Sequence, residues 1–399
     1  MKTSPKSAYF VIVLFGIVSL MGDIVYEGSK GITPDFLKFL GASAVTVGFA
    51  SGLGEFVGYA LRLVSGILAD STQAYWLFIF LGYGLIGSIP ALGLVTRWEI
   101  AVVLYLLERL GKALRTPSRD TILSVVSEEV GTGKAFGFHE LMDQIGATVG
   151  PTAVAAMMLF SGNNYSQTYS FLFLPFLILL GSLLYAYKKV GERTIIAIEK
   201  SVAKHGRDRV LGKSFYMYTA AVVLSTVGLI PASLILYKSS VILQPQKMSW
   251  MVPLIYLLIQ GIDAATAMIS GLAYDKYGIK VLAIPFILAI LPSLLTLSAT
   301  ELAMLAVAAA TFGVVLGMQE SIYRAAVSKF TSVSSRGTAY GIFNAALGIA
   351  FLISGGIYGF FLDYNVPLLM ILPFTVLLQI VAVIMLLRAA STLKAVEKR

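Results

Sequence analysis

Apolar stretches of about 20 residues recur along the whole chain, and this feature restricts its fold more than any other. A helix needs about 20 mostly apolar residues to cross a bilayer, and there it satisfies its own backbone hydrogen bonds. We therefore predict an all-α polytopic membrane protein with twelve transmembrane helices. The second, fourth, fifth and tenth are the least apolar. The predicted spans lie near residues 9–28, 45–68, 74–95, 99–118, 137–160, 168–188, 214–237, 250–272, 281–299, 301–325, 339–361 and 366–388.

Composition excludes several classes of protein. Hydrophobic residues make up 57% of the chain and charged residues 13%, whereas soluble domains carry about 25% charged residues. The chain has no cysteine, and its two histidines lie far apart in the sequence, so neither disulfides nor a His-rich metal site is expected. Phosphate-binding glycine loops and nucleophile motifs are also missing from the sequence. We predict no metal, no cofactor and no enzymatic activity.

The basic residues indicate how the chain sits in the membrane. An even number of spans places both termini on one side. With the termini inside, 24 of the 30 Lys and Arg residues lie on the cytoplasmic side, as the positive-inside rule requires. We expect a multi-pass protein of the cell membrane with both termini cytoplasmic. The net charge of +9 then reflects topology, and no nucleic-acid partner is expected.

A polar stretch in the middle of the chain divides the predicted spans into two groups of six. It reads "KKVGERTIIAIEKSVAKHGRDRVLGK" and holds eight basic residues. We predict an N-terminal bundle (1–187), a cytoplasmic linker (188–213) and a C-terminal bundle (214–399). The linker either acts only as a tether or holds a surface helix that lies against anionic lipid.

Two sequence motifs occur twice, once in each half. "SGILADSTQ" (65–73) returns as "SGLAYDKYG" (270–278), and "GKAFGFH" (133–139) returns as "GTAYGIF" (337–343). Fixed offsets of this kind indicate an internal repeat, and two parallel six-helix halves are an architecture of secondary transporters. An offset of 205 residues also relates two pairs of charged residues, Asp70 with Asp275 and Arg119 with Arg324.

The repeated loop resembles the signature of the major facilitator superfamily, G-x-L-x-D-x-x-G-R/K, which in that family follows the second and eighth spans. The resemblance implies two pseudo-twofold-related bundles that open alternately to either face. It also implies that the partners of the protein are a small-molecule substrate and the lipid bilayer. We expect a monomer. The first copy lacks the usual basic residues after Asp70, so we expect Arg62 or a base of the fourth span to pair with that carboxylate.

The fifth span contains a second pattern. Gly137, Gly146, Gly150 and Pro151 fit G-x8-G-x3-G-P, which resembles a pattern of proton-driven exporters, although Val154 replaces its last glycine. Small residues at such spacings let two helices touch backbone to backbone, and proline bends a helix. The pattern therefore favours export, or serves tight packing alone.

Ionisable residues within the first two spans are candidates for function. A charge near the bilayer centre costs about 2.5–3.5 kcal/mol on insertion scales and is expected to face a polar interior. Asp23, Glu27 and Lys30 are spaced i, i+4, i+7 in the first span, and Glu55 lies near mid-depth in the second. We interpret the three carboxylates as candidates for proton coupling or substrate binding. For Glu55 the alternative is a structural salt bridge to Arg109 or Lys112.

The fourth span carries a stripe of charge from the midplane to the cytoplasmic face. By depth, we expect Arg115 to meet Glu140 of the fifth span, and Lys112 to meet Asp143. The deeper residues either bind substrate or protons or only pair with each other, and the outer ones are expected to act as latches. The stripe consists of Glu108, Lys112, Arg115 and Arg119, with Arg109 turned about 100° from it.

The second half is poorer in charge, and Asp263 is its one carboxylate at meaningful depth. This asymmetry predicts that the first half handles protons. Over the whole chain, the candidates for proton coupling or substrate binding are Asp23, Glu27, Glu55, Glu108, Arg109, Lys112, Asp143 and Asp263. The candidates for the cytoplasmic gate are Arg62, Asp70, Arg115, Arg119, Glu140, Asp275 and Arg324.

These observations favour a proton-coupled secondary transporter that exports a small organic molecule by antiport. The nearest alternative keeps the fold and reverses the coupling: a symporter or uniporter that imports an organic anion, with Arg62, Arg109 and Lys112 as the anion clamp. A remote alternative is a membrane sensor that does not transport.

Overall fold

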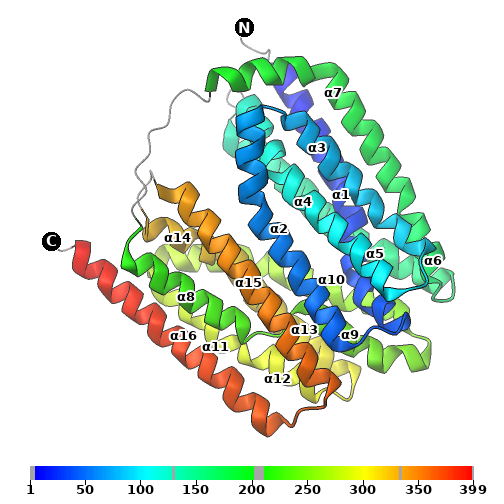
Figure 1. Cartoon of the computed structure of the whole chain (residues 1–399), viewed down its shortest axis with the longest axis vertical. Coiled ribbons are helices and arrows are strands. Elements are labelled where there is room, and N and C mark those ends of the chain that lie inside the picture. The colour runs from blue at the N-terminus through cyan, green and yellow to red at the C-terminus, as the bar shows by residue number, and fades with distance from the viewer. Residues whose placement is uncertain (1–4, 128–130, 202–210, 332–334, 398–399) are drawn as a thin grey trace. The chain divides into compact units, whose positions relative to one another are not determined.

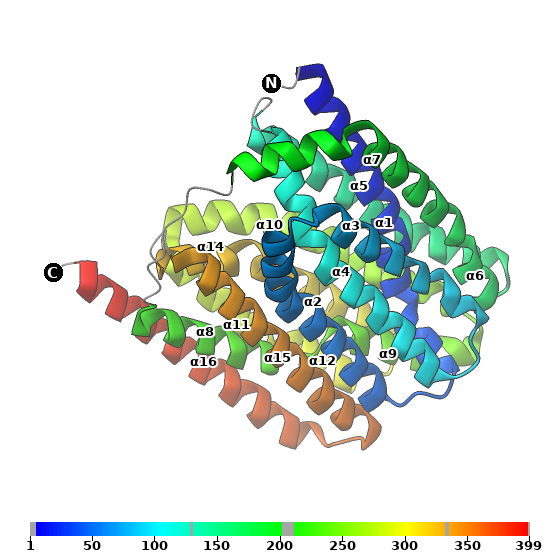
Figure 2. The same ribbon diagram turned by 45° about the horizontal axis from the view of Figure 1, so that its top comes forward.

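The computed structural model describes residues 5–127, 131–201, 211–331 and 335–397, and the regular structure in these ranges is entirely helical (Figures 1 and 2). The prediction of an all-α fold is confirmed. The α-helices are α1 (Pro5–Phe39), α2 (Ala44–Thr72), α3 (Tyr75–Gly84), α4 (Trp98–Ser127), α5 (Thr132–Phe160), α6 (Tyr165–Phe171), α7 (Phe173–Ser201), α8 (Lys213–Val227), α9 (Ala232–Leu243), α10 (Val252–Tyr277), α11 (Ala283–Leu288), α12 (Ile290–Ser298), α13 (Leu302–Met318), α14 (Arg324–Lys329), α15 (Arg336–Asp363) and α16 (Leu368–Glu397). Shorter helical turns are η1 (Leu85–Ser88), η2 (Pro90–Leu94), η4 (Gln244–Gln246), η5 (Ser249–Met251), η6 (Gly278–Leu282) and the π-helical turn η7 (Gln319–Tyr323).

Nine helical segments of the described residues are long and apolar enough to cross a membrane, which makes the chain a multi-pass membrane protein. One of them, Ser249–Ser298, spans 50 residues and contains α10, α11 and α12. Helices α4 and α5 are not among the nine, although they have 30 and 29 residues. They are the fourth and fifth predicted spans, and their polar side chains lower their hydropathy. The count of twelve transmembrane helices stays a prediction.

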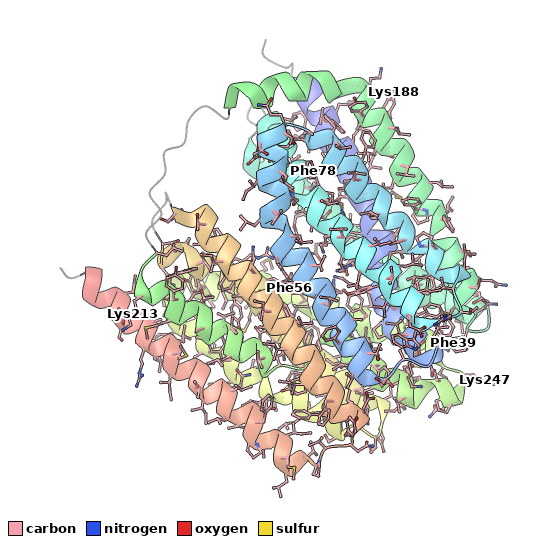
Figure 3. All side chains as sticks on the ribbon, viewed as in Figure 1. Phe39, Phe56, Phe78, Lys188, Lys213 and Lys247 are labelled. Atoms are coloured by element: carbon pink, nitrogen blue, oxygen red, sulfur yellow. The ribbon has the colours of Figure 1, made fainter. Side chains whose placement is uncertain are left out.

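The described chain forms two compact units. Unit 1 comprises residues 1–33 and 57–205, and unit 2 comprises residues 34–56 and 206–399. In unit 1, α3 packs along α4; in unit 2, α10 packs along α13 and α8 along α16. Helix α7 continues into the predicted linker as far as Ser201, and its ribbon bends near Lys188 (Figure 3). Residues 202–210 of that linker lie outside the described residues, and the predicted domain boundaries stay a prediction.

Unit 2 includes the end of α1 and the first half of α2 because several polar contacts join them to helices from late in the chain. The backbone N–H groups of Ala44 and Val45 each donate a 2.8 Å hydrogen bond to the carboxylate of Asp363, at the end of α15. This carboxylate satisfies two of the donors that a helix start leaves without intrahelical partners. Beside this cap, a Cβ added at Gly48 would lie 2.1 Å from the carbonyl oxygen of Gly355, so α2 and α15 touch backbone to backbone.

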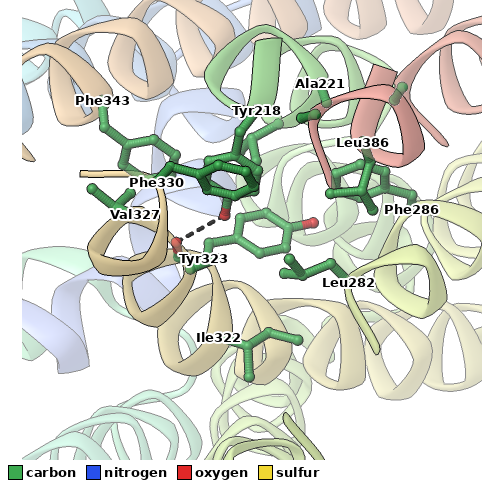
Figure 4. Packing of buried hydrophobic residues seen from close by; sticks show 14 of the residues in the cluster. Tyr218, Ala221, Leu282, Phe286, Ile322, Tyr323, Val327, Phe330, Phe343 and Leu386 are labelled. Atoms are coloured by element: carbon green, nitrogen blue, oxygen red, sulfur yellow. Dashed lines mark hydrogen bonds between the residues drawn. The ribbon is translucent and has the colours of Figure 1, made fainter. Parts of the chain in front are cut away.

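The core of unit 2 is built around aromatic rings (Figure 4). Tyr218 of α8 stacks on Phe330 with ring centroids 4.8 Å apart, and its ring is parallel to that of Phe343 at 5.9 Å. Its hydroxyl donates a 2.8 Å hydrogen bond to the carbonyl of Tyr323, in η7. Such offset stacking adds to the stabilisation from burying the rings, and the hydroxyl remains satisfied inside an apolar core.

Candidate functional site

Helix α1 places a row of polar side chains in the interior of unit 1. Asp23 and Glu27 are each 6% exposed, and Tyr26, which lies between them on the same face, is 8% exposed. One turn further along, the ammonium of Lys30 forms a 2.9 Å ion pair with Glu27. The spacings of three and four residues put all four side chains on one side of the helix, as predicted for the three charged ones.

Helix α4 supplies a fully buried carboxylate that is held by two arginines. Glu108 is 0% exposed, and its Oε2 accepts from Nε of Arg109 at 2.6 Å. Its Oε1 accepts from Nη2 of Arg115 at 3.1 Å, and Nη1 of that arginine donates to the carbonyl of Gly82 at 3.3 Å. Hydrogen bonds between guanidinium groups and a carboxylate are charge-assisted and strong, so Glu108 joins Arg109 and Arg115 into one buried group.

The ring of Tyr26 lies among the cations of both helices. Cations attract the face of an aromatic ring when they lie within about 6 Å of its centroid. The distances from the cationic groups to the Tyr26 centroid are 4.6 Å for Lys112, 5.3 Å for Arg115, 5.5 Å for Lys30 and 5.6 Å for Arg109. The Tyr26 cluster is defined here as Asp23, Tyr26, Glu27, Lys30, Glu108, Arg109, Lys112 and Arg115.

Five polar side chains from α1, α4 and α5 form a second group that adjoins the cluster. Arg119 donates to the hydroxyl of Ser19 at 3.3 Å and forms a 2.8 Å ion pair with Asp120. On α5, Nδ1 of the buried His139 lies 3.3 Å from Oδ2 of Asp143. Asp143 interacts electrostatically with both Arg119 and Asp23. The predicted residue Asp143 therefore connects the two groups.

The pairing expected from depth differs from the pairing in the structure. Arg115 does not reach Glu140, and Lys112 does not reach Asp143, among the ion pairs of the described residues. Glu140 is exposed and accepts a 3.1 Å hydrogen bond from Gln144 on its own helix. The reason is local: Arg115 reaches back seven residues along α4 to the buried carboxylate, which is a closer acceptor than any on α5.

Two of the predicted packing glycines bring α5 against α1 at the cluster. A Cβ added at Gly146 would lie 2.6 Å from the Cβ of Asp23, and one at Gly150 would lie 2.8 Å from the carbonyl of Ile24. At Gly137 an added Cβ would meet no atom within 4 Å. Pro151 lies inside α5. Close helix contact therefore depends on the middle two glycines of the pattern, and not on the first.

Helix α2 contributes the remaining candidates of the first half. Glu55 is half-buried and belongs to unit 2, whereas Arg62 belongs to unit 1 and lies 5.2 Å from the ring centroid of Tyr59. Asp70 is exposed, and its hydrogen-bond donor is the hydroxyl of Tyr75 at 2.9 Å. The expected partner, Arg62 or a base of the fourth span, is replaced by a tyrosine five residues along the chain.

The candidates of the second half lie in unit 2 and are more dispersed. Asp263 is 7% exposed, and its carbonyl lies 2.4 Å from the position of a Cβ added at Gly317, so α10 and α13 are in close contact there. Asp275 and Arg324 are exposed, and the Arg324 carbonyl accepts a 3.1 Å hydrogen bond from Tyr340.

The aromatic part of the site was not predicted from the charge pattern of the sequence. Tyr26 is contacted by the cations of α4, Tyr105 lies 5.4 Å from the guanidinium of Arg109, and Tyr83 lies 5.3 Å from that of Arg115. A signal was present for Tyr26, which follows Asp23 by three residues and therefore shares its helix face. For Tyr83 the sequence gives no comparable signal, because its position depends on how α3 packs along α4.

Comparisons with known proteins agree with this architecture. A family model described as Major Facilitator Superfamily matches residues 8–355. An uncharacterized protein of Mycobacterium tuberculosis (strain ATCC 25618 / H37Rv) is 33% identical over 386 residues, which cover 95% of this chain and 93% of that protein. An uncharacterized MFS-type transporter of Methanocaldococcus jannaschii is 28% identical over 354 residues, 88% of this chain and 87% of that protein.

Solved structures show the same fold at low sequence identity. A crystal structure of the nucleoside transporter NupG superposes with a TM-score of 0.70 at 14% identity and covers 96% of this chain and 98% of its own. A variant of the peptide transporter POT in complex with alafosfalin gives a TM-score of 0.70 at 15% identity and covers 95% and 94% of the two chains.

Proposed function

The chain belongs to the Major Facilitator Superfamily, and on this premise we propose that it is a secondary transporter that couples the movement of a small organic solute to protons through Asp23. Membership of the family supports a secondary transporter, and we propose that its two halves expose a site to either face in turn. The coupling ion, the solute and the direction are the parts that we propose.

The observation that carries the proposal is the contrast among the carboxylates of the Tyr26 cluster. Glu108 is paired with two arginines and Glu27 with Lys30. Asp23 is equally buried, yet no cation of the described residues lies within 4.0 Å of its carboxylate. Its hydrogen bond comes from Tyr26, and the charge of Asp143 opposes its own. A buried carboxylate that is not ion-paired within a membrane-spanning helix is a candidate for a functional group, and we assign the proton to Asp23 on this ground.

Export by antiport is the first candidate for the direction, and it is supported by the glycine pattern of α5. Gly146 lets this helix approach α1 at Asp23 itself. A movement of α5 against α1 would therefore change the surroundings of the proposed proton site.

Import of an organic anion with protons is the second candidate, and it is supported by charge. Four cationic side chains surround Tyr26, against three carboxylates in the same cluster. A proton on Asp23 would increase this excess of positive charge. An anion bound in the cluster and a proton on Asp23 would then stabilise each other, and such mutual stabilisation is reciprocal.

Proton movement in proteoliposomes tests the proposal. The purified protein is reconstituted with a pH-sensitive dye inside, and a panel of metabolites and drugs is added outside. We expect some solute to move protons, into the lumen if they enter with the solute by symport or out of the lumen if they exchange for it by antiport, and we expect Asp23→Asn to abolish this movement. Glu99→Gln, on the exposed start of the same helix as Glu108, serves as the matched control. Coupled proton movement that persists in Asp23→Asn would contradict the proposal.

A further inference from the structure

Lys112 differs from the other cations of the Tyr26 cluster in its partners. Arg109 and Arg115 bind Glu108, and Lys30 binds Glu27. Within the described residues, the ammonium of Lys112 forms neither a hydrogen bond nor an ion pair, and its contact is the ring face of Tyr26 at 4.6 Å. A lysine ammonium has three donors, so this group retains the capacity to bind an oxyanion.

Lys112 lies among charges of both signs. Three other cations lie in electrostatic range of it, from α1, α2 and α4: Lys30, Arg62 and Arg109. The carboxylates in range are Asp23, Glu27 and Glu108. Glu27 and Glu108 are ion-paired with other cations, so Asp23 is the carboxylate, among these three, that is not ion-paired and can contribute to the balance of the Lys112 charge. When Asp23 is protonated, Lys112 loses that balance.

Lys112 is less buried than the carboxylate and the arginine beside it on α4. Glu108 and Arg109 are 0% and 2% exposed, whereas Lys112 is only partly buried, and the side chain of its neighbour Lys30 is 22% exposed. The aliphatic stem of a lysine packs on apolar surface while its ammonium extends toward polar surroundings. The attraction between the ammonium and the ring of Tyr26, 4.6 Å from its centroid, restrains the ammonium, and such restraint lowers the entropy lost when a ligand binds.

We propose that Lys112, held on the ring of Tyr26, is the subsite for the negatively charged group of the solute, and that the solute is a small organic carboxylate. The inference rests on the proposed function, because it assigns a substrate class to the same cluster. Lys112 as the anion subsite favours the second of the two candidates above, co-transport of the anion with protons, over the first, since charges of opposite sign stabilise each other at neighbouring sites. Around Asp23 the groups that set this linkage are Tyr26 and Glu27 on α1, Lys112 on α4 and Asp143 on α5.

Binding of paired probes to the purified full-length protein tests the inference. Benzoate carries a carboxylate, and benzamide has nearly the same shape without the charge. We expect benzoate to raise the melting temperature and benzamide to leave it unchanged, because a ligand stabilises the state that binds it. Lys112→Met keeps the aliphatic stem and should weaken benzoate binding by about ten- to a hundredfold, the usual loss for a hydrogen bond to a charged group. Lys112→Arg keeps the charge and should retain most of the affinity.

The controls separate this inference from the proposed function. Lys276 also lies over a tyrosine ring, 5.1 Å from the centroid of Tyr277, but on the exposed end of α10; Lys276→Met should leave benzoate binding unchanged. Equal effects of benzoate and benzamide, no stabilisation by benzoate, or full binding in Lys112→Met would overturn the inference. Asp23→Asn imitates the protonated state and should bind benzoate about fivefold tighter or more. Suppose that Asp23→Asn binds benzoate with unchanged affinity while Lys112→Met still loses benzoate binding. This result would count against Asp23 as the proton site but would still support Lys112 as the anion subsite.

Discussion

The interiors of the two units repeat one sequence motif but are built from different side chains. In unit 1 the repeated stretch ends at His139, which is buried against the carboxylate of Asp143. In unit 2 the corresponding stretch ends at Phe343, whose ring is parallel to that of Tyr218 in an apolar core (Figure 4). The position four residues further on is Leu347, which belongs to the same core. The repeat therefore preserves the helices, whereas the ionisable groups are concentrated in the first half of the chain.

This difference suggests a division of labour. Buried charges are costly in a membrane unless they are paired and serve a function, and unit 1 carries them on α1, α4 and α5. Both units use glycines for close helix contact, but unit 2 uses stacked rings for its core. We infer that unit 1 handles the ions and that the aromatic interior of unit 2 provides a rigid counterpart. The predictions below test this contrast.

Removal of the Glu108 charge should have the largest effect on stability. Glu108→Gln leaves Arg109 and Arg115 buried without their carboxylate, and breaking a buried pair in this way costs about 3–5 kcal/mol. We expect a clear fall in melting temperature in detergent solution. Glu99→Gln, on the exposed start of α4, should melt like the unmodified protein. Equal melting temperatures for Glu108→Gln and the control would show that the cluster contributes nothing to the stability of unit 1.

A comparable loss is expected in unit 2 from packing alone. Phe343→Ala removes a ring that is 1% exposed, and deletions of this kind cost about 3–5 kcal/mol through lost burial and the cavity left behind. Because no charge is involved, the loss should be the same at low and high salt. Phe360→Ala, on the same helix at a position that is 47% exposed, is the control. A salt-dependent loss would contradict the assignment of an apolar core.

The α1–α5 contact should respond to a single methyl group. Gly146→Ala places a Cβ 2.6 Å from that of Asp23, and overpacking of this kind costs about 1–3 kcal/mol. Thermal unfolding and proton-coupled transport should both be impaired. Gly137→Ala, where an added Cβ meets no atom within 4 Å, should behave normally. If both variants were unimpaired, α5 would not approach α1 as described.

The smallest effect is expected from one hydroxyl in unit 2. Tyr218→Phe removes the hydrogen bond to the Tyr323 carbonyl but keeps the stacked ring. A typical hydrogen bond contributes about 0.5–1.5 kcal/mol, so thermal unfolding should shift by a correspondingly small amount. Tyr216→Phe, at a residue that is 51% exposed, is the control. A loss as large as that of Phe343→Ala would show that the hydroxyl, and not the ring, organises this core.

The sequence predicted the helical architecture well because the signals are local. Length and hydropathy of each segment depend only on neighbouring residues, and the repeated motif fixes the internal repetition. The spacing of Asp23, Glu27 and Lys30 likewise placed them on one face of α1, and the structure confirms this arrangement.

The ion pairs between helices were harder to predict. They depend on the rotation of each helix about its axis and on the length of each side chain, and not only on depth in the membrane. Arg115 was expected to meet Glu140, but its long side chain follows α4 back to Glu108. Asp70 was expected to bind a base, but Tyr75 is closer. Neither outcome can be derived from the spacing of charges, since several acceptors lie within reach of each long side chain.

Infrared difference spectroscopy on the reconstituted protein tests the central claim most directly, because it observes carboxyl protonation without a known solute. A shift from alkaline to acidic pH should produce the C=O band of a buried protonated carboxyl group. The account predicts that this band disappears in Asp23→Asn of unit 1 and persists in Asp263→Asn of unit 2. A band that persists in the first variant, or disappears only in the second, would contradict the assignment of proton coupling to Asp23.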